Sequence, residues 1–357
     1  MTTNKNHNSP NVPNLRFPEF EGEWEKIELQ DIVPNICSGK DKISNSGKVV
    51  LYGSTGVIGK TDFASYKKNI VLVARVGANA GQLQIGNAPC GVTDNTLVID
   101  AKEWNYYIYY FLQHYNLNRL VFGSGQPLIT GGMLKKIKVG HGNKVERIKI
   151  TRLLCLLDKR IATQNKIIED LKKLKSAISE RLFKSVKGSI VLLSDICDIV
   201  KGKQINGENL SERGRYYVMN GGTEPSGYYD DYNVEANTIS ISEGGNSCGY
   251  VQFNTFPFWS GGHCYSIQNV TGNVDNLYLY HYLKSNEDNI MKLRIGSGLP
   301  NIQKKDLAMF KIIVPTLEQQ MTISTFLSSI ERKAQIEADI LIAMQSEKQH
   351  LLRQMFI

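Results

Sequence analysis

The sequence has no long hydrophobic run. Across 357 residues, no uninterrupted apolar stretch reaches the length needed to span a membrane. The first residues, Met1 to Asn14, are polar and rich in asparagine, and they lack the apolar core of a signal peptide. Hydrophobic residues nevertheless make up 41% of the chain, which is enough for buried cores in two or three domains. We therefore expect a cytoplasmic protein with more than one domain.

Closely spaced metal ligands are also missing. None of the six histidines has metal-ligand spacing to a second histidine, and no two cysteines have the two-residue spacing of a zinc knuckle. Without a secretory signal, a disulfide framework is not expected either. The sequence therefore predicts no metal site and six free thiols that are buried or semi-buried, at Cys37, Cys90, Cys155, Cys197, Cys248 and Cys264.

Signatures of catalysis are absent or incomplete. There is no Asn-Pro-Pro-Tyr or Asp-Pro-Pro-Tyr run for amino methylation, and no Pro-Asp dipeptide to begin a restriction-nuclease pattern. The segment 53–61 resembles a phosphate-binding loop, but five residues instead of four separate its glycines. His263 and Cys264 are adjacent, so in a strand they would point to opposite faces rather than form a catalytic pair. These gaps favour a chain without chemistry of its own.

Positive charge is concentrated in one part of the chain. The formal net charge is +8. Residues 144–186 carry 12 Lys and Arg against 5 Asp and Glu, whereas residues 1–143 carry 15 against 11, residues 187–316 carry 11 against 13, and residues 317–357 carry 4 against 5. Such a basic segment suits a polyanionic partner such as nucleic acid. A basic helix is also common as a solvated face, so charge alone does not establish DNA binding.

The chain contains an internal repeat. At an offset of 168 residues, the segment 69–81 matches 237–249, including strand positions and glycines. After a five-residue insertion in the second copy, the offset becomes 173, and the segment 123–129 matches 296–302. The helices that follow also match, with Ile150, Leu154, Asp158 and Phe183 opposite Ile323, Leu327, Glu331 and Phe356. Matches spread over about 130 residues with a single shift indicate a duplication.

Each copy has a mixed lobe followed by a long helix. The lobes show short strands, such as 70–74, 97–99, 238–242 and 311–314, and short helical pieces near 104–114 and 277–283. Two stretches without Pro or Gly then predict helices over roughly 144–186 and 317–356. The expected fold class is α+β, with lobes at 1–143 and 187–316 and helices at 144–186 and 317–357.

Both helices carry an apolar seam at alternating spacings of four and three. The seam residues are Leu157, Ile161, Ile168, Leu171, Ile178 and Leu182 in the first helix, and Ile330, Ala334, Leu341, Met344, Leu351 and Met355 in the second. Polar residues interrupt the two seams at equivalent places: Gln164 and Lys175, then Glu337 and Lys348. This heptad spacing is typical of a coiled coil.

The duplicate helix is the simplest partner for each seam. If the two helices pack antiparallel, the lobes are related by a pseudo-twofold axis, as the DNA backbone is. Two lobes held at a fixed separation could then recognise two half-sites, and the helix length would set the gap between them. The alternative is a generic coiled-coil module that carries two unrelated lobes.

Several segments resemble the specificity subunit of type I restriction-modification enzymes. The opening 13–24 (PNLRFPEFEGEW) is similar to the family's lead-in to its first recognition domain. The run 296–307 (GSGLPNIQKKDL) is similar to the end of a recognition domain, and 314–320 (VPTLEQQ) with 326–331 (FLSSIE) is similar to the start of the spacer helix. The first helix departs from this pattern, because it opens with NKVERIK at 143–149 and lacks Glu-Gln-Gln.

The resemblance implies a role. Such a subunit does no chemistry; each target-recognition domain recognises one half of a split double-stranded DNA sequence. Two methyltransferase subunits dock on it, and a motor-nuclease subunit can join. The resemblance assigns S-adenosylmethionine, ATP and Mg to those partners and no cofactor to this chain. The family methylates adenine, which must be swung out of the duplex to be reached.

Candidate DNA contacts are polar residues in the loops, because base edges and phosphates need donors and small polar groups. For any one of them, a surface polar residue in a turn is an equal alternative. In the first domain they are Ser38, Lys40, Lys42, Ser54, Thr55, Lys60, Arg75, Asn79, Ser124 and Gln126. In the second they are Lys201, Lys203, Gln204, Arg213, Arg215, Asn220, Thr223, Asn246, Ser247, Ser297 and Asn301.

Two features leave alternatives open. The aromatic runs 106–110 and 278–280 could stack on bases, but presumed helices at matching places favour core packing. The negative charge of the second lobe favours a protein-binding scaffold, and an inactive decoy that still assembles with the methyltransferase would have the same sequence features. Salt-dependent DNA binding and a methylation assay separate these readings.

Overall fold

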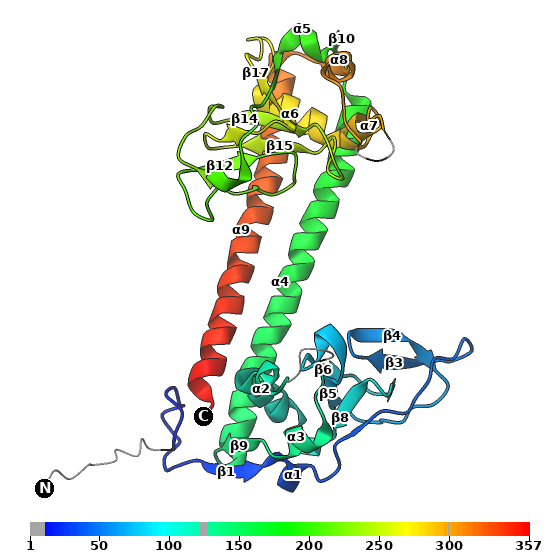
Figure 1. Ribbon diagram of the computed structural model, residues 1–357, viewed down its shortest axis with the longest axis vertical. Coiled ribbons are helices and arrows are strands. Elements are labelled where there is room, and N and C mark those ends of the chain that lie inside the picture. Colours follow the sequence, from blue (N-terminus) through cyan, green and yellow to red (C-terminus); the bar gives the residue numbers. More distant parts are fainter. Residues whose placement is uncertain (1–10, 122–126, 297, 299) are drawn as a thin grey trace, which may run out of the picture. The chain divides into compact units, whose positions relative to one another are not determined.

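The computed structural model describes residues 11–121, 127–296, 298 and 300–357. They form two compact units. Unit 1 comprises the described residues up to Asn165 together with Asp339–Ile357, and unit 2 comprises those within Lys166–Ala338. Each unit contains a lobe of strands and short helices together with part of both long helices, α4 (Lys144–Ser185) and α9 (Leu317–Met355) (Figure 1). The sequence predicted a different division, in which each lobe is separate from the helix that follows it. Its four segments are 1–143, 144–186, 187–316 and 317–357.

The lobe of unit 1 holds three small sheets. Their strands are β1 (Glu25–Glu28), β2 (Cys37–Ser38), β3 (Val49–Gly53), β4 (Gly56–Thr61), β5 (Ile70–Ala74), β6 (Leu83–Gly86), β7 (Cys90–Val92), β8 (Thr96–Ile99) and β9 (Lys138–His141). The sheet orders are β1-β9, β2-β8-β5-β6 and β4-β3-β7, and β3 and β7 are the parallel pair. The helices are α1 (Leu29–Ile32), α2 (Asn105–Tyr115) and α3 (Gly131–Lys135).

The lobe of unit 2 repeats this topology strand for strand. Its strands are β10 (Ser189–Leu192), β11 (Asp198–Lys201), β12 (Tyr216–Met219), β13 (Tyr228–Tyr229), β14 (Thr238–Ser242), β15 (Val251–Asn254), β16 (Trp259–Ser260), β17 (Cys264–Gln268) and β18 (Lys311–Val314). The sheet orders are β10-β18, β11-β17-β14-β15 and β13-β12-β16, again with one parallel pair, β12 and β16. The helices are α5 (Leu193–Ile196), α6 (Asn276–Ser285), α7 (Glu287–Met291) and α8 (Lys304–Ala308).

Both faces of the central strand are covered in each lobe. In β5, Val71 and Val73 pack against α2, while Ile70 and Leu72 face the three-stranded sheet, so the whole strand is apolar and buried. In β14, the isoleucines join the main core but the other face carries Thr and Ser. Asn254 satisfies that polar face, because its Nδ2 donates to Ser240 Oγ at 3.0 Å. The same strand therefore accepts two different sequence patterns.

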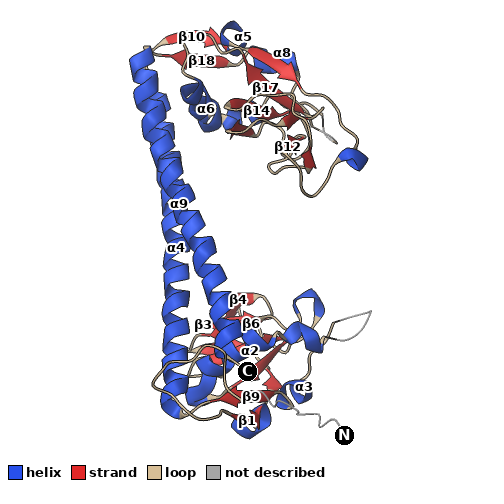
Figure 2. Cartoon of the chain, turned by 90° about the vertical axis from the view of Figure 1, so that its left-hand side faces the viewer, coloured by secondary structure: helices blue, strands red, loops and turns tan. Residues whose placement is uncertain are grey.

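The main core of each unit extends onto both long helices. In unit 1, Ile150 and Leu154 of α4 share the core of α2 with Leu352 and Met355 of α9, so the two helices run antiparallel there. In unit 2, α6 lies between the sheet and the long helices, and Phe183 of α4 and Leu327 of α9 share its core (Figure 2). The predicted seam residues are half-buried, except for Met355, which is buried, and the residues between them are mostly exposed.

The aromatic runs are part of these cores. Tyr107 and Tyr110 are 2% exposed, and Tyr278 is fully buried. Tyr107 OH donates to Gly140 O at 2.7 Å, and Tyr278 OH makes the equivalent bond to Ile313 O. Core packing, rather than base stacking, therefore explains these residues.

A three-residue polar clamp recurs in both units. In unit 1, Tyr110 OH donates to Asp158 Oδ2 at 2.8 Å, and Lys348 Nζ lies 2.7 Å from Asp158 Oδ1. In unit 2, Tyr280 OH donates to Glu331 at 3.1 Å, and Glu331 also pairs with Lys175. Each clamp joins a lobe to both long helices. The lysines that interrupt the seams are thus the two residues that complete the clamps.

The two long helices begin differently. Gln320, in the first turns of α9, is fully buried, and its amide bonds to Asn273 O, Pro315 O and Asp275 N. Arg147 holds the repeat-equivalent position in α4, and its guanidinium carbon lies 3.4 Å from the centroid of the Trp104 ring. The departure from Glu-Gln-Gln is therefore compensated by a cation–π contact.

A buried ion pair adds to the start of α4. Glu146 is fully buried, and both its oxygens accept bonds from the Arg16 guanidinium, at 2.7 and 2.9 Å. Those hydrogen bonds raise the pKa of Arg16, so its guanidinium stays charged. The backbone N–H of the neighbouring Leu15 donates to Gln354 O at 2.9 Å. The N-terminal segment therefore ties α4 and the end of α9 together within unit 1.

We expect Arg16→Ala to destabilise unit 1 by about 3–5 kcal/mol, because it leaves the Glu146 carboxylate buried without a counter-charge. Chemical unfolding of the full chain, or of its complex, measures the change. The double variant Arg16→Ala/Glu146→Gln removes the buried charge as well, so it should recover most of the loss. An Arg16→Ala chain that unfolds like the wild type would contradict this account.

Candidate nucleic-acid interface

Loops gather at one end of the four-stranded sheet in unit 1. We name residues 39–42, 75–81, 93–96 and 127–129 turn cluster 1. Backbone hydrogen bonds hold it together: Gly39 N to Thr96 O, Arg75 N to Asn95 O, Gly77 N to Pro127 O, and Ile129 N to Arg75 O, all at 2.9–3.0 Å. These bonds fix the loop after β2 and the loop after β5 to the segment before β8, and they fix the loop after β5 to residues 127–129.

Unit 2 contains the same arrangement. We name residues 202–204, 243–249, 261–263 and 300–302 turn cluster 2. Its bonds run from Gly202 N to Cys264 O, Glu243 N to His263 O, Gly245 N to Pro300 O, and Ile302 N to Glu243 O, at 2.8–3.0 Å. Each bond is the repeat equivalent of one in turn cluster 1.

A glycine shapes the turn after β5 in turn cluster 1, and another shapes the turn after β14 in turn cluster 2. Gly81 and Gly249 both have φ +91, a conformation that side chains rarely adopt. Added Cβ atoms would lie 3.2 Å from Ile129 and 2.8 Å from Met291, respectively. The glycines thus fix the backbone, and the side chains that differ between the copies sit around an unchanged framework.

Most predicted contact residues in the described regions lie in or beside the two clusters. Lys40, Lys42 and Asn79 are exposed in turn cluster 1, while Arg75 there and Ser38 beside it are half-buried. In or beside turn cluster 2, Lys201, Lys203, Gln204, Asn246 and Asn301 are exposed, and Ser247 is half-buried. Asn220 joins this cluster, because its Oδ1 accepts from His263 N at 3.2 Å.

Other predicted residues lie on the outer sheets and loops. Ser54, Thr55 and Lys60 belong to the β3–β4 hairpin, which Gln84 ties to β6 through a bond to Gly53 O. Arg213, Arg215 and Thr223 are exposed in the loops on either side of β12. Ser124, Gln126 and Ser297 lie outside the described residues. Whether any of these residues contacts DNA stays a prediction.

Glu243 is a residue of turn cluster 2 that could not be recognised from its local sequence. This residue follows β14, is 7% exposed, and occupies the position that Arg75 holds in unit 1. Its Oε1 accepts from Lys201 Nζ at 2.7 Å and from Tyr265 OH at 3.1 Å. An acid is not an obvious candidate in a DNA-facing loop. The opposite charges at matched positions 75 and 243 were the signal that could have revealed it.

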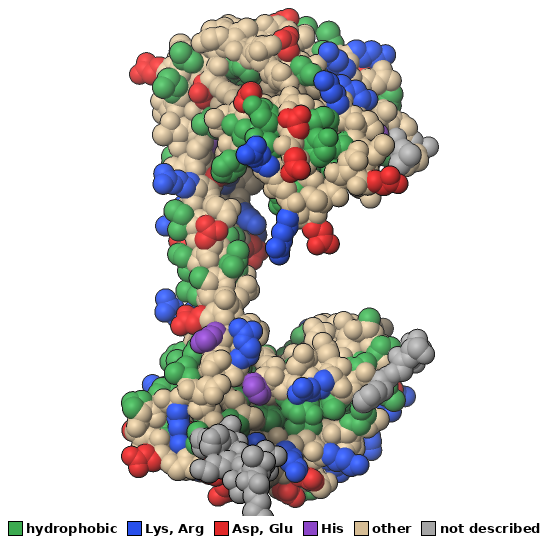
Figure 3. Space-filling model, turned by 60° about the vertical axis from the view of Figure 1, so that its left-hand side comes forward, with side chains coloured by type: hydrophobic (Ala, Val, Ile, Leu, Met, Phe, Trp, Pro, Cys, Tyr) green, Lys and Arg blue, Asp and Glu red, His purple; other side chains and the backbone are tan. Residues whose placement is uncertain are grey.

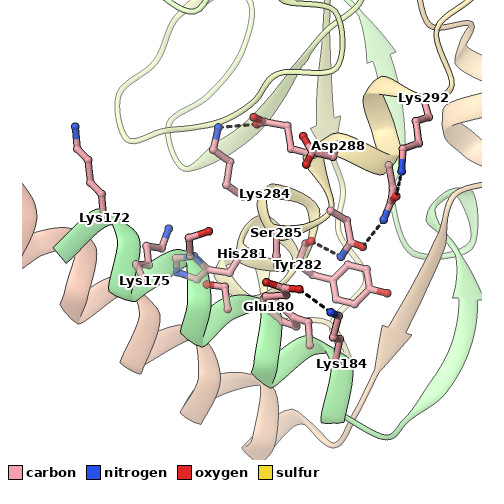
Figure 4. Close-up of a pocket in the computed structure, with 16 residues that line it drawn as sticks. Lys172, Lys175, Glu180, Lys184, His281, Tyr282, Lys284, Ser285, Asp288 and Lys292 are labelled. Atoms are coloured by element: carbon pink, nitrogen blue, oxygen red, sulfur yellow. Dashed lines mark hydrogen bonds and ion pairs between the residues drawn. The ribbon is translucent and has the colours of Figure 1, made fainter. Parts of the chain in front are cut away.

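Unit 2 also has a polar cleft of about 640 Å³ between α4, α6 and α7 (Figure 4). Five lysines line it, but Lys184 and Lys284 pair with Glu180 and Glu287 at 2.6 Å, and Lys175 belongs to the clamp. Burial lowers the pKa of His281 to about 4, so this residue is neutral, and its Nε2 lies 2.9 Å from Ser328 Oγ. Because these side chains already have partners within the chain, we interpret the cleft as the place where α4 meets the lobe of unit 2.

In the described part of the chain, no group of three or more His, Cys, Asp and Glu side chains could hold a metal ion. All six cysteines are unpaired, and the prediction that they are buried or semi-buried is wrong for Cys37, which is exposed in the short strand β2. Among the described helices, none is both long and apolar enough to cross a membrane.

Comparison with known proteins identifies the family. The model of the type I restriction modification DNA specificity domain matches twice, at residues 21–173 and 188–345. A putative type I specificity subunit of Mycoplasma genitalium is 24% identical over 296 residues, covering 76% of this chain and 77% of that protein. The putative MjaX specificity subunit of Methanocaldococcus jannaschii is also 24% identical, over 92% of this chain and 91% of its own length.

Solved structures agree on the fold. The crystal structure of the S subunit from M. genitalium superposes with a TM-score of 0.72 at 19% identity, covering 97% of this chain and 99% of the other. A chain from a structure of type I R-M complex assembly gives a TM-score of 0.55 at 14% identity, covering 94% and 98%. With the family domain present twice, in two lobes of one topology, the chain belongs to the type I restriction-modification specificity subunits.

Proposed function

We propose that each unit recognises one half of a bipartite double-stranded DNA target and that the chain performs no chemistry itself. The observation that carries this proposal is the pair of turn clusters. Their backbone hydrogen bonds are equivalent, whereas the side chains around them differ. A common framework with exchangeable side chains is what two readers of different base sequences need.

The proposal includes two methyltransferase subunits that dock on the long helices. The first turns of both helices expose apolar side chains: Val145 and Ile148 of α4 are 66% and 55% exposed, and Leu317 and Met321 of α9 are 44% and 55% exposed. Of these, Ile148 and Met321 hold equivalent positions in the repeat. Apolar side chains are also visible on the exposed surface of the long helices in Figure 3. Two similar apolar surfaces suit two copies of one partner.

The chemistry would then lie in the partners. S-adenosylmethionine would be held by the methyltransferase subunits, and ATP with Mg by a motor-nuclease subunit where one joins. The target adenine would leave the duplex to enter a methyltransferase. This chain would supply the sequence preference and the spacing.

Expression of the chain with its cognate methyltransferase, followed by long-read sequencing of modified adenine, tests the proposal. We expect a new split motif, with two short defined parts around a fixed gap. Binding of the complex to DNA that carries the motif should weaken steeply as salt rises, because phosphate contacts release counterions. A co-purifying methyltransferase without new methylation would instead support an inactive decoy.

A protein-binding scaffold is the second candidate, favoured by the 13 acidic against 11 basic residues of 187–316. It predicts co-purification with partners but no salt-dependent DNA binding by the complex.

A further inference from the structure

We propose that Lys201 reads a guanine in the half-site of unit 2 and that Glu243 is the residue that positions it. This inference rests on the proposed function, because it assigns one base contact within turn cluster 2. It also gives a role to the carboxylate of Glu243, which is too buried to contact DNA itself.

Glu243 is an anchor rather than a reader. Its side chain is 10% exposed, so a base in a groove cannot reach it. Oε1 accepts from Lys201 Nζ at 2.7 Å and from Tyr265 OH at 3.1 Å. Oε2 is buried without a hydrogen-bond partner among the described residues, and it lies 3.9 Å from His263 Nδ1. A buried carboxylate with so few partners holds its cation firmly, because losing the cation would leave the charge uncompensated.

Lys201 has hydrogen-bond donors that its contact with Glu243 does not use. Its side chain is 53% exposed, and it extends from the last residue of β11 at the edge of turn cluster 2. An ammonium group has three N–H donors, and one of them is directed at Glu243. Glu243 is the one partner found for Lys201 Nζ among the described residues, so two donors are left for an acceptor outside the protein. The anchored lysine is therefore a fixed pair of donors, unlike a freely rotating surface lysine.

Guanine is the base that matches two donors. In the major groove it presents two acceptors, N7 and O6. Adenine presents one acceptor beside a donor, thymine one acceptor beside a methyl group, and cytosine a donor. With the Glu243 carboxylate buried, the Lys201–Glu243 pair offers no exposed acceptor to a donor on adenine or cytosine. The chemistry of the pair thus selects a G·C base pair in one orientation.

The equivalent place in unit 1 is equipped differently. Ser38 replaces Lys201, as the matched pairings Ser38 with Leu97 and Lys201 with Tyr265 show. Arg75 replaces Glu243. The backbone is the same, so the exchange of a Lys–Glu pair for a Ser–Arg pair changes the reading chemistry without changing the fold. This is the pattern expected where two half-sites differ.

The test uses the full chain in complex with its cognate methyltransferase, with methylated adenine mapped by long-read sequencing. The half-site of unit 2 is the one that persists when residues 1–143 are exchanged. Lys201→Met/Glu243→Gln removes both charges without leaving a buried ion. We expect preference for one guanine in that half-site to fall roughly 5- to 150-fold, with the other half-site unchanged.

Further variants separate reading from folding. Glu243→Gln alone should relax the same guanine position, because Lys201 is then no longer held. Lys201→Arg should keep the guanine, since arginine also presents paired donors. Lys187→Ala, at an exposed lysine outside the cluster, should change nothing. The intact half-site of unit 1 and an unchanged unfolding midpoint show that each variant is folded.

Two results would overturn the inference. One is a double variant that keeps the wild-type motif. The other is relaxation at a position that is not a G·C pair. A wild-type chain that yields no split motif would instead refute the proposed function itself, and the two failures are distinguished by the wild-type result. Should Glu243→Gln fail to fold, the exposed Lys201→Arg and the charge-neutral double variant still decide the question.

Discussion

Exchange of residues 1–143 for the recognition domain of another specificity subunit should replace one half of the methylated motif and leave the other half as it was. The reason is that each turn cluster is built from its own lobe, with all its backbone hydrogen bonds inside that lobe. Mapping of methylated adenine in cells that express the exchanged chain with its methyltransferase measures both halves at once. The effect is complete replacement of one half-site rather than a shift in affinity.

The boundary of the exchange must leave the buried Arg16–Glu146 pair intact, because residue 143 lies close to this pair in the sequence and Arg16 lies within the exchanged segment. A grafted lobe that lacks an arginine at the position of Arg16 would leave Glu146 unpaired and destabilise unit 1. The matched control is an exchange that retains residues 11–24 of this chain. Loss of both half-sites in a folded, assembled complex with that control would argue against independent readers.

Shortening both long helices together should shorten the gap between the half-sites without altering their sequences. A matched deletion removes the same number of residues from each long helix between the two clamps. The two clamps are separated by 17 residues on both helices, from Asp158 to Lys175 on α4 and from Glu331 to Lys348 on α9. Removal of residues 160–166 and 340–346 takes one heptad from each interval and keeps both clamps paired. Seven residues of helix correspond to about 10 Å, so we expect the gap to shrink by roughly one to three base pairs.

The single-helix deletion is the control for this experiment. Removing residues 160–166 alone leaves α9 at full length, so at least one clamp loses its partner even though the apolar seam keeps its heptad phase. We expect that variant to assemble poorly and to methylate little. A matched deletion that changes the bases of a half-site, with the gap unchanged, would contradict a ruler made of helices.

Features that repeat in the sequence could be predicted, and features that depend on one copy could not. The helix expected over 144–186 is observed as Lys144–Ser185, and the one over 317–356 as Leu317–Met355, because heptad spacing and the absence of Pro and Gly act locally. The two lobes share one topology because β-branched strands and turn glycines recur at a fixed offset.

Contacts between residues distant in sequence escaped prediction. Arg16 and Glu146 are 130 residues apart, and nothing in their local sequences indicates a pair. The lysines in the seams looked like interruptions, because the tyrosine and carboxylate that engage them come from other elements. Glu243 was overlooked for the same reason: its role depends on Lys201, which lies 42 residues away on another strand.

The division of the chain into units has a consequence for its synthesis. Unit 2 is one continuous stretch, Lys166–Ala338, whereas unit 1 needs residues from both ends of the chain. Leu352, Met355 and Phe356 belong to the core that contains α2. The lobe of unit 1 leaves the ribosome before the lobe of unit 2 and yet completes its core later, once residues 352–356 have emerged. A premature stop codon before Leu352 would therefore damage the lobe that was translated earlier.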